Sequence, residues 1–312
     1  MRGQGSPTQK GSWSQPASPA RRIASALADP VISIRGLRKS YGEFEAVGGV
    51  DLEVRAGEVF AFLGPNGAGK TTTVEILEGY RKRSGGEVSV LGEDPERAGR
   101  SWRERIGIVL QNCRLDPYLT VRESLGLYAG YYSAPRPVDE VVELVGLGGK
   151  ADARTGGLSG GQQRRLDVGM ALVGDPELLF LDEPTTGFDP SARRHAWDTI
   201  AGLRDLGKTV FLTTHYMDEA QRLADRVTII SRGEIVASGT PEDLGHRDSL
   251  PTTISYRLDG EEVSVETTNP VADLHELTGR AVEQGLVLEG LEVTRPNLED
   301  VYLSLTGEEE SG

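Results

Sequence analysis

Short, continuous apolar runs stand out in the hydrophobic pattern of this chain, and the strands they predict cover residues 58–63, 106–110, 178–181 and 210–212. Each run is too short for a helix and lacks the polar alternation of a half-exposed strand. Such runs are typical of strands buried on both faces in a parallel sheet that helices cover. The pattern therefore favours an α/β fold built on an open sheet.

Alternating patterns surround these runs. Residues 31–34 and 50–54 alternate apolar with polar side chains and predict strands ahead of the first run. Residues 86–92 predict a short edge strand, and residues 226–231 with 234–238 predict a hairpin. Strands therefore lie on both sides of the buried runs.

The stretch from about residue 113 to 165 has helical spacing instead. Thr120 and Glu123 form a capping box ahead of a predicted helix over 121–132, and the apolar residues of 138–145 predict another helix. We expect a helical subdomain inserted between the strands.

The organisation changes again near Leu244. Residues 250–307 predict a hairpin, a helix that begins at Asn269-Pro270, a strand over 286–293 and a final helix from Asn297. We expect residues 30–245 to form the main domain. Residues 250–307 are expected to form a small α+β accessory domain that packs on the main domain or on a second copy, since it would be marginal alone.

The N-terminal residues 1–29 are rich in Ser, Gly, Pro and Gln and are expected to form a disordered tail. Arg21-Arg22 and the apolar residues after them offer an alternative, a twin-arginine export signal. The apolar run is short and Pro30 ends it, so the tail interpretation is favoured.

Composition narrows the function classes. The formal net charge of −14 argues against binding along the phosphate backbone of nucleic acid, so no nucleic-acid partner is expected. The single cysteine, Cys113, cannot form an internal disulfide, which fits a reducing compartment. No stretch approaches 18 consecutive apolar residues, so the chain is not expected to span a membrane by itself.

A phosphate-binding loop follows the first buried run. It consists of Gly64, Pro65, Asn66, Gly67, Ala68, Gly69, Lys70 and Thr71, which fit the pattern G-x-x-x-x-G-K-[ST]. The glycines let backbone N–H groups point at phosphate oxygens, the lysine reaches the β- and γ-phosphates, and the threonine hydroxyl ligates Mg²⁺. The helix predicted over 71–78 directs its positive end at the nucleotide, and Thr72 joins the predicted binding set.

Polar residues at the ends of the other buried runs extend this site. Gln111, the pair Asp182-Glu183 and His215 each follow a predicted strand, and open α/β sheets hold ligands at these strand ends. Adjacent carboxylates there need partners, which gives Asp182 a role in ordering Mg²⁺ and Glu183 a role in polarising the attacking water. Tyr41 becomes a candidate platform for adenine.

Leu158-Ser-Gly-Gly-Gln162 precedes another predicted helix. Taken alone it is a good N-terminal cap with a hydroxyl and free N–H groups.

Together these motifs resemble, in order and spacing, the motif set of the ATP-binding cassette ATPases. The resemblance covers about residues 31–244 and rests on Tyr41, Gly64–Thr71, Gln111, Leu158–Gln162, Asp182-Glu183, Asp189 and His215. It implies a P-loop NTPase fold: a RecA-like core with an antiparallel β subdomain and an inserted helical subdomain, followed here by the small C-terminal α+β domain. Phe188 is a mild departure, because leucine is commoner at that position.

The resemblance also implies ligands and roles. ATP and Mg²⁺ are the expected ligands, with Tyr41 stacking on adenine and with Thr71, Gln111 and Asp182 serving Mg²⁺. Glu183 is the implied catalytic base and His215 the switch histidine, with Gln111 counted in the catalytic set. The signature residues, Ser159, Gly160, Gly161 and Gln162, would close on ATP held by a second copy, so a homodimer is expected, and the Phe188-Asp189 segment would couple the two sites.

Finer similarity lies in residues 184–190, 213–220 and 297–307, which resemble the daunorubicin-resistance type of exporter ATPase. That resemblance implies a separate membrane-spanning permease as partner, efflux of a drug or other small hydrophobic compound, and a place at the cytoplasmic face of the membrane.

Two other classes of protein are disfavoured. A soluble cassette ATPase acting on DNA or ribosomes usually has two cassettes, coiled-coil insertions or basic surfaces, and this acidic chain has one cassette. A regulator that binds ATP without turnover is disfavoured by the presence of both Glu183 and His215.

Overall fold

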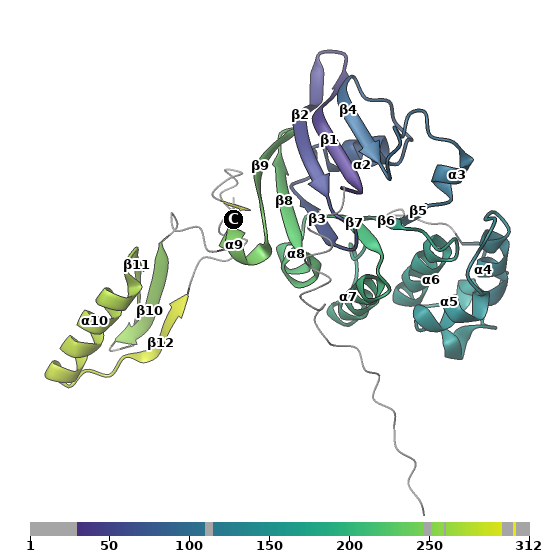
Figure 1. Ribbon diagram of the computed structural model, residues 1–312. Helices are drawn as coiled ribbons and strands as arrows, with labels where there is room; N and C mark the ends of the chain where they lie inside the picture. The colour runs from purple at the N-terminus through teal and green to yellow at the C-terminus, as the bar shows by residue number, and fades with distance from the viewer. Residues whose placement is uncertain (1–29, 110–114, 246–250, 259, 295–301, 304–312) are drawn as a thin grey trace, which may run out of the picture.

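The computed structural model describes residues 30–109, 115–245, 251–258, 260–294 and 302–303 of the chain. Three sheets organise these residues, one of six strands and two of three (Figure 1). The elements are arranged so that one end of the six-stranded sheet carries the predicted site.

The six-stranded sheet has the strand order β5-β6-β7-β3-β8-β9. Its strands are β3 (Val59–Leu63), β5 (Ile106–Val109), β6 (Leu178–Asp182), β7 (Thr209–Thr214), β8 (Arg226–Ser231) and β9 (Glu234–Gly239). Neighbouring strands are parallel except β8 and β9, which form the predicted hairpin. The apolar runs therefore do form a parallel sheet, as predicted.

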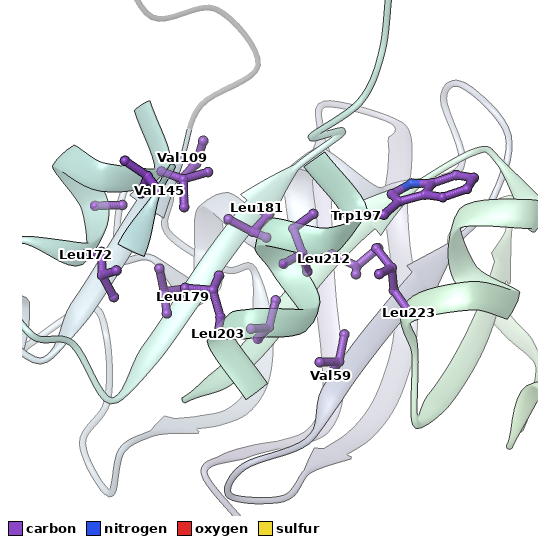
Figure 2. Close-up of a cluster of buried hydrophobic side chains, with 14 of the residues drawn as sticks. Val59, Val109, Val145, Leu172, Leu179, Leu181, Trp197, Leu203, Leu212 and Leu223 are labelled. Atoms are coloured by element: carbon purple, nitrogen blue, oxygen red, sulfur yellow. The ribbon is translucent and has the colours of Figure 1, made fainter. Parts of the chain in front are cut away.

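Helices cover both faces of this sheet. They are α2 (Lys70–Leu77), α6 (Gly160–Leu172), α7 (Pro190–Asp205), α8 (Met217–Leu223) and α9 (Pro241–Gly245). Because side chains alternate along a strand, Phe60, Phe180 and Phe211 face α2 in one core cluster. The alternate residues of the same strands, such as Ala61, Leu181 and Leu212, face α6, α7 and α8 in the other core cluster, part of which Figure 2 shows. The helices α2 and α6 therefore lie on opposite faces of the sheet.

A three-stranded antiparallel sheet lies over the α2 side (Figure 1). Its strands are β1 (Ile32–Tyr41), β2 (Phe44–Val54) and β4 (Gly85–Val90), and the short helix α3 (Arg100–Arg103) follows β4. The strand predicted over 31–34 was too short, since β1 continues to Tyr41. Irregularities in its pairing with β2, after Ile34 and again near Arg38, break the alternation that the sequence pattern relies on.

The inserted region is helical as predicted. It contains α4 (Val121–Ala129), α5 (Val138–Leu144) and two short 3₁₀ turns, Gly148–Lys150 and Thr155–Gly157. Both halves of the Thr120 capping box are present. The helix ends at Ala129 and not at residue 132, because Gly130 follows it and glycine is a poor helix former.

The C-terminal unit has the predicted α+β composition. Its strands are β10 (Thr252–Leu258), β11 (Glu261–Thr267) and β12 (Glu289–Thr294), in the order β11-β10-β12, with α10 (Pro270–Gln284) between β11 and β12 in sequence. Asn269 caps α10 as predicted, and the last strand begins at Glu289, later than predicted. Of the predicted final helix only residues 302–303 are described, and the Tyr302 side chain is buried in the core cluster that faces α6, α7 and α8.

None of the helices in the described residues has both the length and the apolar character needed to cross a bilayer.

Candidate functional site

Three neighbouring strands bring the predicted site residues together. Leu63 at the end of β3 pairs with Thr214 on β7, and Asp182 at the end of β6 pairs with Thr213. Parallel strands end at the same edge of a sheet, so the phosphate loop, the two carboxylates and His215 follow three adjacent strand ends.

The glycines of the phosphate loop are required by close packing. A Cβ on Gly64 would lie 2.3 Å from the Ile230 carbonyl oxygen, and one on Gly69 would lie 2.6 Å from that of Ala46. Gly69 also has φ of +104°, in the region that favours glycine. The loop therefore lies against the backbone of β2 and β8.

The Lys70 ammonium lies inside the loop. It donates hydrogen bonds to the carbonyl oxygens of Gly64 and Pro65 at 2.6 and 3.0 Å, and it is 3.8 Å from Glu183 Oε1. Only 5% of the side chain is exposed, and this burial lowers its pKa, while Glu183 and Asp182 act in the opposite direction. The position is a ready binding point for a polyphosphate, whose oxygens can replace the carbonyl partners.

The two carboxylates at the end of β6 are fixed by hydroxyl groups. The Thr213 hydroxyl donates to Asp182 Oδ1 at 2.5 Å and accepts a hydrogen bond from the Glu183 backbone N–H at 3.1 Å. The Thr186 hydroxyl donates to Glu183 Oε2 at 3.2 Å. These contacts orient both carboxylates relative to β7.

Glu183 also contacts the predicted switch histidine. Its Oε1 atom is 3.2 Å from His215 Nδ1, so one carboxylate oxygen lies between the Lys70 ammonium and the His215 ring. The backbone of Glu183 has φ of +45°, which is uncommon for a residue with a side chain and is a form of strain found at functional sites.

Tyr41 is the last residue of β1, the middle strand of the antiparallel sheet, and 41% of its surface is exposed. The Lys39 ammonium is 5.0 Å and the Arg81 guanidinium 5.4 Å from its ring centroid. An exposed ring with cations beside it can stack on an aromatic base.

The signature residues begin α6, on the face of the sheet opposite α2. Ser159 caps the helix: its hydroxyl accepts from the Gln162 N–H, and Gln162 Oε1 accepts from the Ser159 N–H at 3.0 Å. Farther along α6, the buried Arg164 donates to the carbonyl oxygens of Asp182 and Pro184. The signature helix is therefore tied to the loop that carries Glu183, and it packs on the face of the sheet opposite α2.

Asp189 caps α7 by accepting from the N–H groups of Ser191 and Ala192 at 2.8 and 2.9 Å. These hydrogen bonds, first that of Ala192 and then that of Ser191, lower the pKa of its carboxyl. The Asp189 segment thereby connects the Glu183 loop to α7.

The donor set fits Mg²⁺ beside a polyphosphate. The Thr71 hydroxyl follows Lys70 directly, and the Asp182 carboxylate lies on the neighbouring strand end, both oxygen donors of the kind Mg²⁺ prefers. Gln111, the third predicted magnesium residue, lies outside the described residues.

Thr213 and Thr186 were not predicted as contacts of the carboxylates. Their signal was present, since hydroxyl residues occur at the end of β7 and shortly after Glu183. What the sequence lacked was the pairing of Asp182 with Thr213, which the sheet register supplies.

A phosphate loop on α2, paired carboxylates and a histidine on the adjacent strand ends, and an inserted helical region define an ATP-binding cassette of the P-loop ATPase class. Comparison with known proteins is consistent with this class: the family model described as "ABC transporter" matches residues 47–186.

Relatives extend the match over nearly the whole chain. An ATP-binding protein I of Nod factor export from Cupriavidus pinatubonensis is 40% identical over 94% of this chain and 95% of its own length. The protein of the same name from Ralstonia nicotianae is 41% identical over 90% and 95%. The chain belongs to the ABC transporter family as an ATP-binding subunit, an ATPase coupled to transport that binds ATP with Mg²⁺.

Solved structures agree with the fold. The cbiO1 protein from Clostridium perfringens, part of the ABC transporter complex cbiONQ, matches with a TM-score of 0.64 and 28% identity over 70% of this chain and 91% of its own. An ATP-binding cassette of an ABC transporter in its ADP conformation matches with a TM-score of 0.62 and 25% identity over 69% and 93%.

Proposed function

We propose that this chain powers an exporter of a drug or other small hydrophobic compound, with a separate permease carrying the compound across the membrane. The resemblance of residues 184–190, 213–220 and 297–307 to the daunorubicin-resistance type supports this proposal, as do relatives named for export. The chain would then lie at the cytoplasmic face of the membrane, bound to that permease.

The observation that carries the site assignment is the position of Glu183. Its carboxylate, oriented by Thr186, lies between the Lys70 ammonium and His215. Lys70 and the loop N–H groups bind the phosphates, and Glu183 accepts the proton of the water that attacks the γ-phosphorus. The bond to the bridging oxygen breaks, ADP leaves with that oxygen, and His215 orients Glu183 and the γ-phosphate.

In this proposal Thr71, Asp182 and Gln111 hold Mg²⁺, which supplies neutralisation of the phosphate charge when bound. Tyr41 stacks on the adenine. The site of one chain is completed by Ser159 to Gln162 of a second copy, because the helix that these residues begin packs on the face of the sheet opposite α2, the helix that follows the loop of their own chain.

The permease is proposed to dock at a cavity of about 610 Å³ between the strand β5, the end of α2 and the helical region. Three tyrosines, Tyr80, Tyr128 and Tyr131, form an aromatic patch there: the first two line the cavity, and the third packs edge-on against Tyr128. Tyr80 and Tyr131 are 77% and 65% exposed, and exposed aromatic groups of this kind favour protein contacts.

Substitution of Glu183 tests the chemical assignment. Glu183→Gln keeps the size of the side chain and removes its basicity, so it should keep ATP binding and lose about 10²–10⁴-fold in kcat. Lys70→Ala should instead weaken ATP binding itself. Steady-state hydrolysis and nucleotide titration separate the two effects, and near-normal hydrolysis by Glu183→Gln would overturn the assignment.

A further inference from the structure

A buried carboxyl on α8 has no part in the proposed chemistry. Glu219 is 0% exposed, and it follows His215 by four residues. Burial raises the pKa of its carboxyl, while the Thr214, Thr185 and Trp197 donors act in the opposite direction. Burial of a carboxyl costs free energy unless hydrogen-bond partners compensate for the lost water.

The donors to Glu219 come from the two segments that carry the proposed catalytic residues and from α7. Its Oε1 accepts from the Thr185 hydroxyl at 2.8 Å and from the Trp197 indole N–H at 3.1 Å. The Thr214 hydroxyl is close enough to affect its pKa and itself accepts a hydrogen bond from the Tyr216 N–H at 2.9 Å. Thr185 is two residues after Glu183, and Thr214 directly precedes His215.

Further contacts around Glu219 join α7 to the residues that follow His215. The Arg193 guanidinium lies 4.4 Å from the centroid of the Tyr216 ring and 3.6 Å from Asp218, and Arg222 lies 5.3 Å from the Trp197 ring. Since Asp189 caps α7, the contacts of Glu219 connect the three segments that carry Glu183, His215 and Asp189.

One oxygen of the Glu219 carboxyl can still accept a hydrogen bond. Its Oε2 atom is buried and has no hydrogen bond of normal geometry within the described part of the chain. Such a half-satisfied carboxyl can exchange partners when the Asp189 segment shifts, which a saturated one cannot do without losing a hydrogen bond.

We propose that Glu219 is a positioning residue that holds the Glu183 loop and the His215 loop at a fixed separation and links both to the Asp189 helix. The inference rests on the proposed roles of Glu183, Asp189 and His215. Glu219 acts through Thr185 and Thr214 and touches neither ATP nor the reacting water.

The proposal predicts a loss of kcat with little change in KM. Glu219→Ala in the full chain should lower kcat for ATP about 10–100-fold, because the catalytic groups lose their relative position, while KM for ATP stays within about two-fold. Glu219→Gln keeps an acceptor for Thr185 and Trp197 and an amide toward Thr214, so it should restore kcat to within about three-fold of the wild type. If Glu219→Gln is as slow as Glu219→Ala, the positioning role is wrong.

A matched control separates position from stability. Thr228→Val also removes a buried hydrogen bond, that with Ser238 at 2.7 Å, but on β8 away from the carboxylates. It should lower the unfolding free energy and leave kcat unchanged. Equal kcat losses in Glu219→Ala and Thr228→Val would reduce the effect to stability and overturn the proposal.

NMR of the His215 ring tests the proposal even if the isolated chain hydrolyses ATP too slowly for reliable kinetics. The His215 ring resonance, assigned with His215→Ala, should shift in Glu219→Ala and in Thr185→Val and remain in place in Thr228→Val. An unmoved resonance in both site variants would contradict the proposal. Glu183→Gln in the same assays distinguishes the failures: if it is inactive while Glu219→Ala is fully active, only the Glu219 inference falls.

Discussion

Hydroxyl groups, more than charges, fix the geometry around Glu183. The Thr213 hydroxyl binds the Asp182 carboxylate, and the Thr186 hydroxyl binds that of Glu183. The pairing of β6 with β7 places Thr213 beside Asp182. A hydroxyl both donates and accepts, so Thr213 can bind the Asp182 carboxylate and the Glu183 N–H at once. The strained backbone of Glu183 is thereby supported from the neighbouring strand.

Glu78 predicts a pH-dependent stability. Burial raises the pKa of its carboxyl to about 8, and the nearby Asp182 and Glu75 add to the effect. A carboxyl whose folded pKa exceeds its unfolded value stabilises the fold only while protonated, so this contribution is lost as the pH rises from 4.5 through 8. The loss amounts to at most about 5 kcal/mol.

Urea unfolding at pH 5 and pH 9 checks this. The wild type should lose stability between these values, and Glu78→Gln should lose much less. Glu177→Gln is the control, because Arg105 lowers the pKa of that carboxyl and its titration lies below the tested range. The same pH dependence in Glu78→Gln and the wild type would refute the role of Glu78.

The sequence predicted which side chains form the site better than it predicted the contacts between them. Lys70, Asp182, Glu183 and His215 lie together as expected, since each follows a strand of one sheet. The buried Glu219 was not predicted, because a carboxylate in the first turn of a helix is ordinarily exposed and favourable to the helix dipole.

Among the elements, two helix starts are built alike and differ in their proposed use. Thr120 and Ser159 each make a complete capping box, with Glu123 and with Gln162. Thr120 begins α4 in the inserted region, and Ser159 begins the helix that is proposed to meet the ATP of a second copy.

Removal of the two hydroxyls should therefore separate structure from function. Ser159→Ala and Thr120→Ala should each lower the free energy of unfolding by about 1 kcal/mol, the usual effect of losing a cap. Only Ser159→Ala should also lower the rate of ATP hydrolysis. If Thr120→Ala reduces hydrolysis equally, the signature role of Ser159 loses its support.

Elements were predicted well where their packing is uniform. The buried strands appear as plain apolar runs because both of their faces are covered. The prediction failed at β1, where irregular pairing shifts side chains from face to face, and at the end of α4, where Gly130 stops the helix before the apolar spacing ends.

For the whole molecule, the aromatic patch predicts where the permease binds. Replacing Tyr80 and Tyr131 together with serine should reduce co-purification with the permease about 10-fold or more, since exposed tyrosines are common anchors of interfaces. ATP hydrolysis by the isolated chain should be unchanged.

Tyr118→Ser supplies the control, because Tyr118 is 76% exposed yet does not line the cavity. It should leave the complex intact. Permease binding that survives the double substitution would place the docking surface elsewhere.

The sequence left open whether the C-terminal unit packs on the main domain or on a second copy of the chain. Its sheet and α10 form a body of their own beyond α9 (Figure 1). Tyr302, however, belongs to the core cluster of the cassette. Tyr302 thus packs against the main domain, while the expectation of contact with a second copy stays a prediction.

The opposite placement of the phosphate loop and the signature helix has a genetic consequence under the proposed pairing of two copies. Each composite site takes its loop from one chain and its signature from the other. An allele damaged at Lys70 and an allele damaged at Ser159 can then complement each other, because their mixed pair still contains one intact site. The same two lesions carried on a single allele leave no intact site when paired with the wild type, so that allele is dominant.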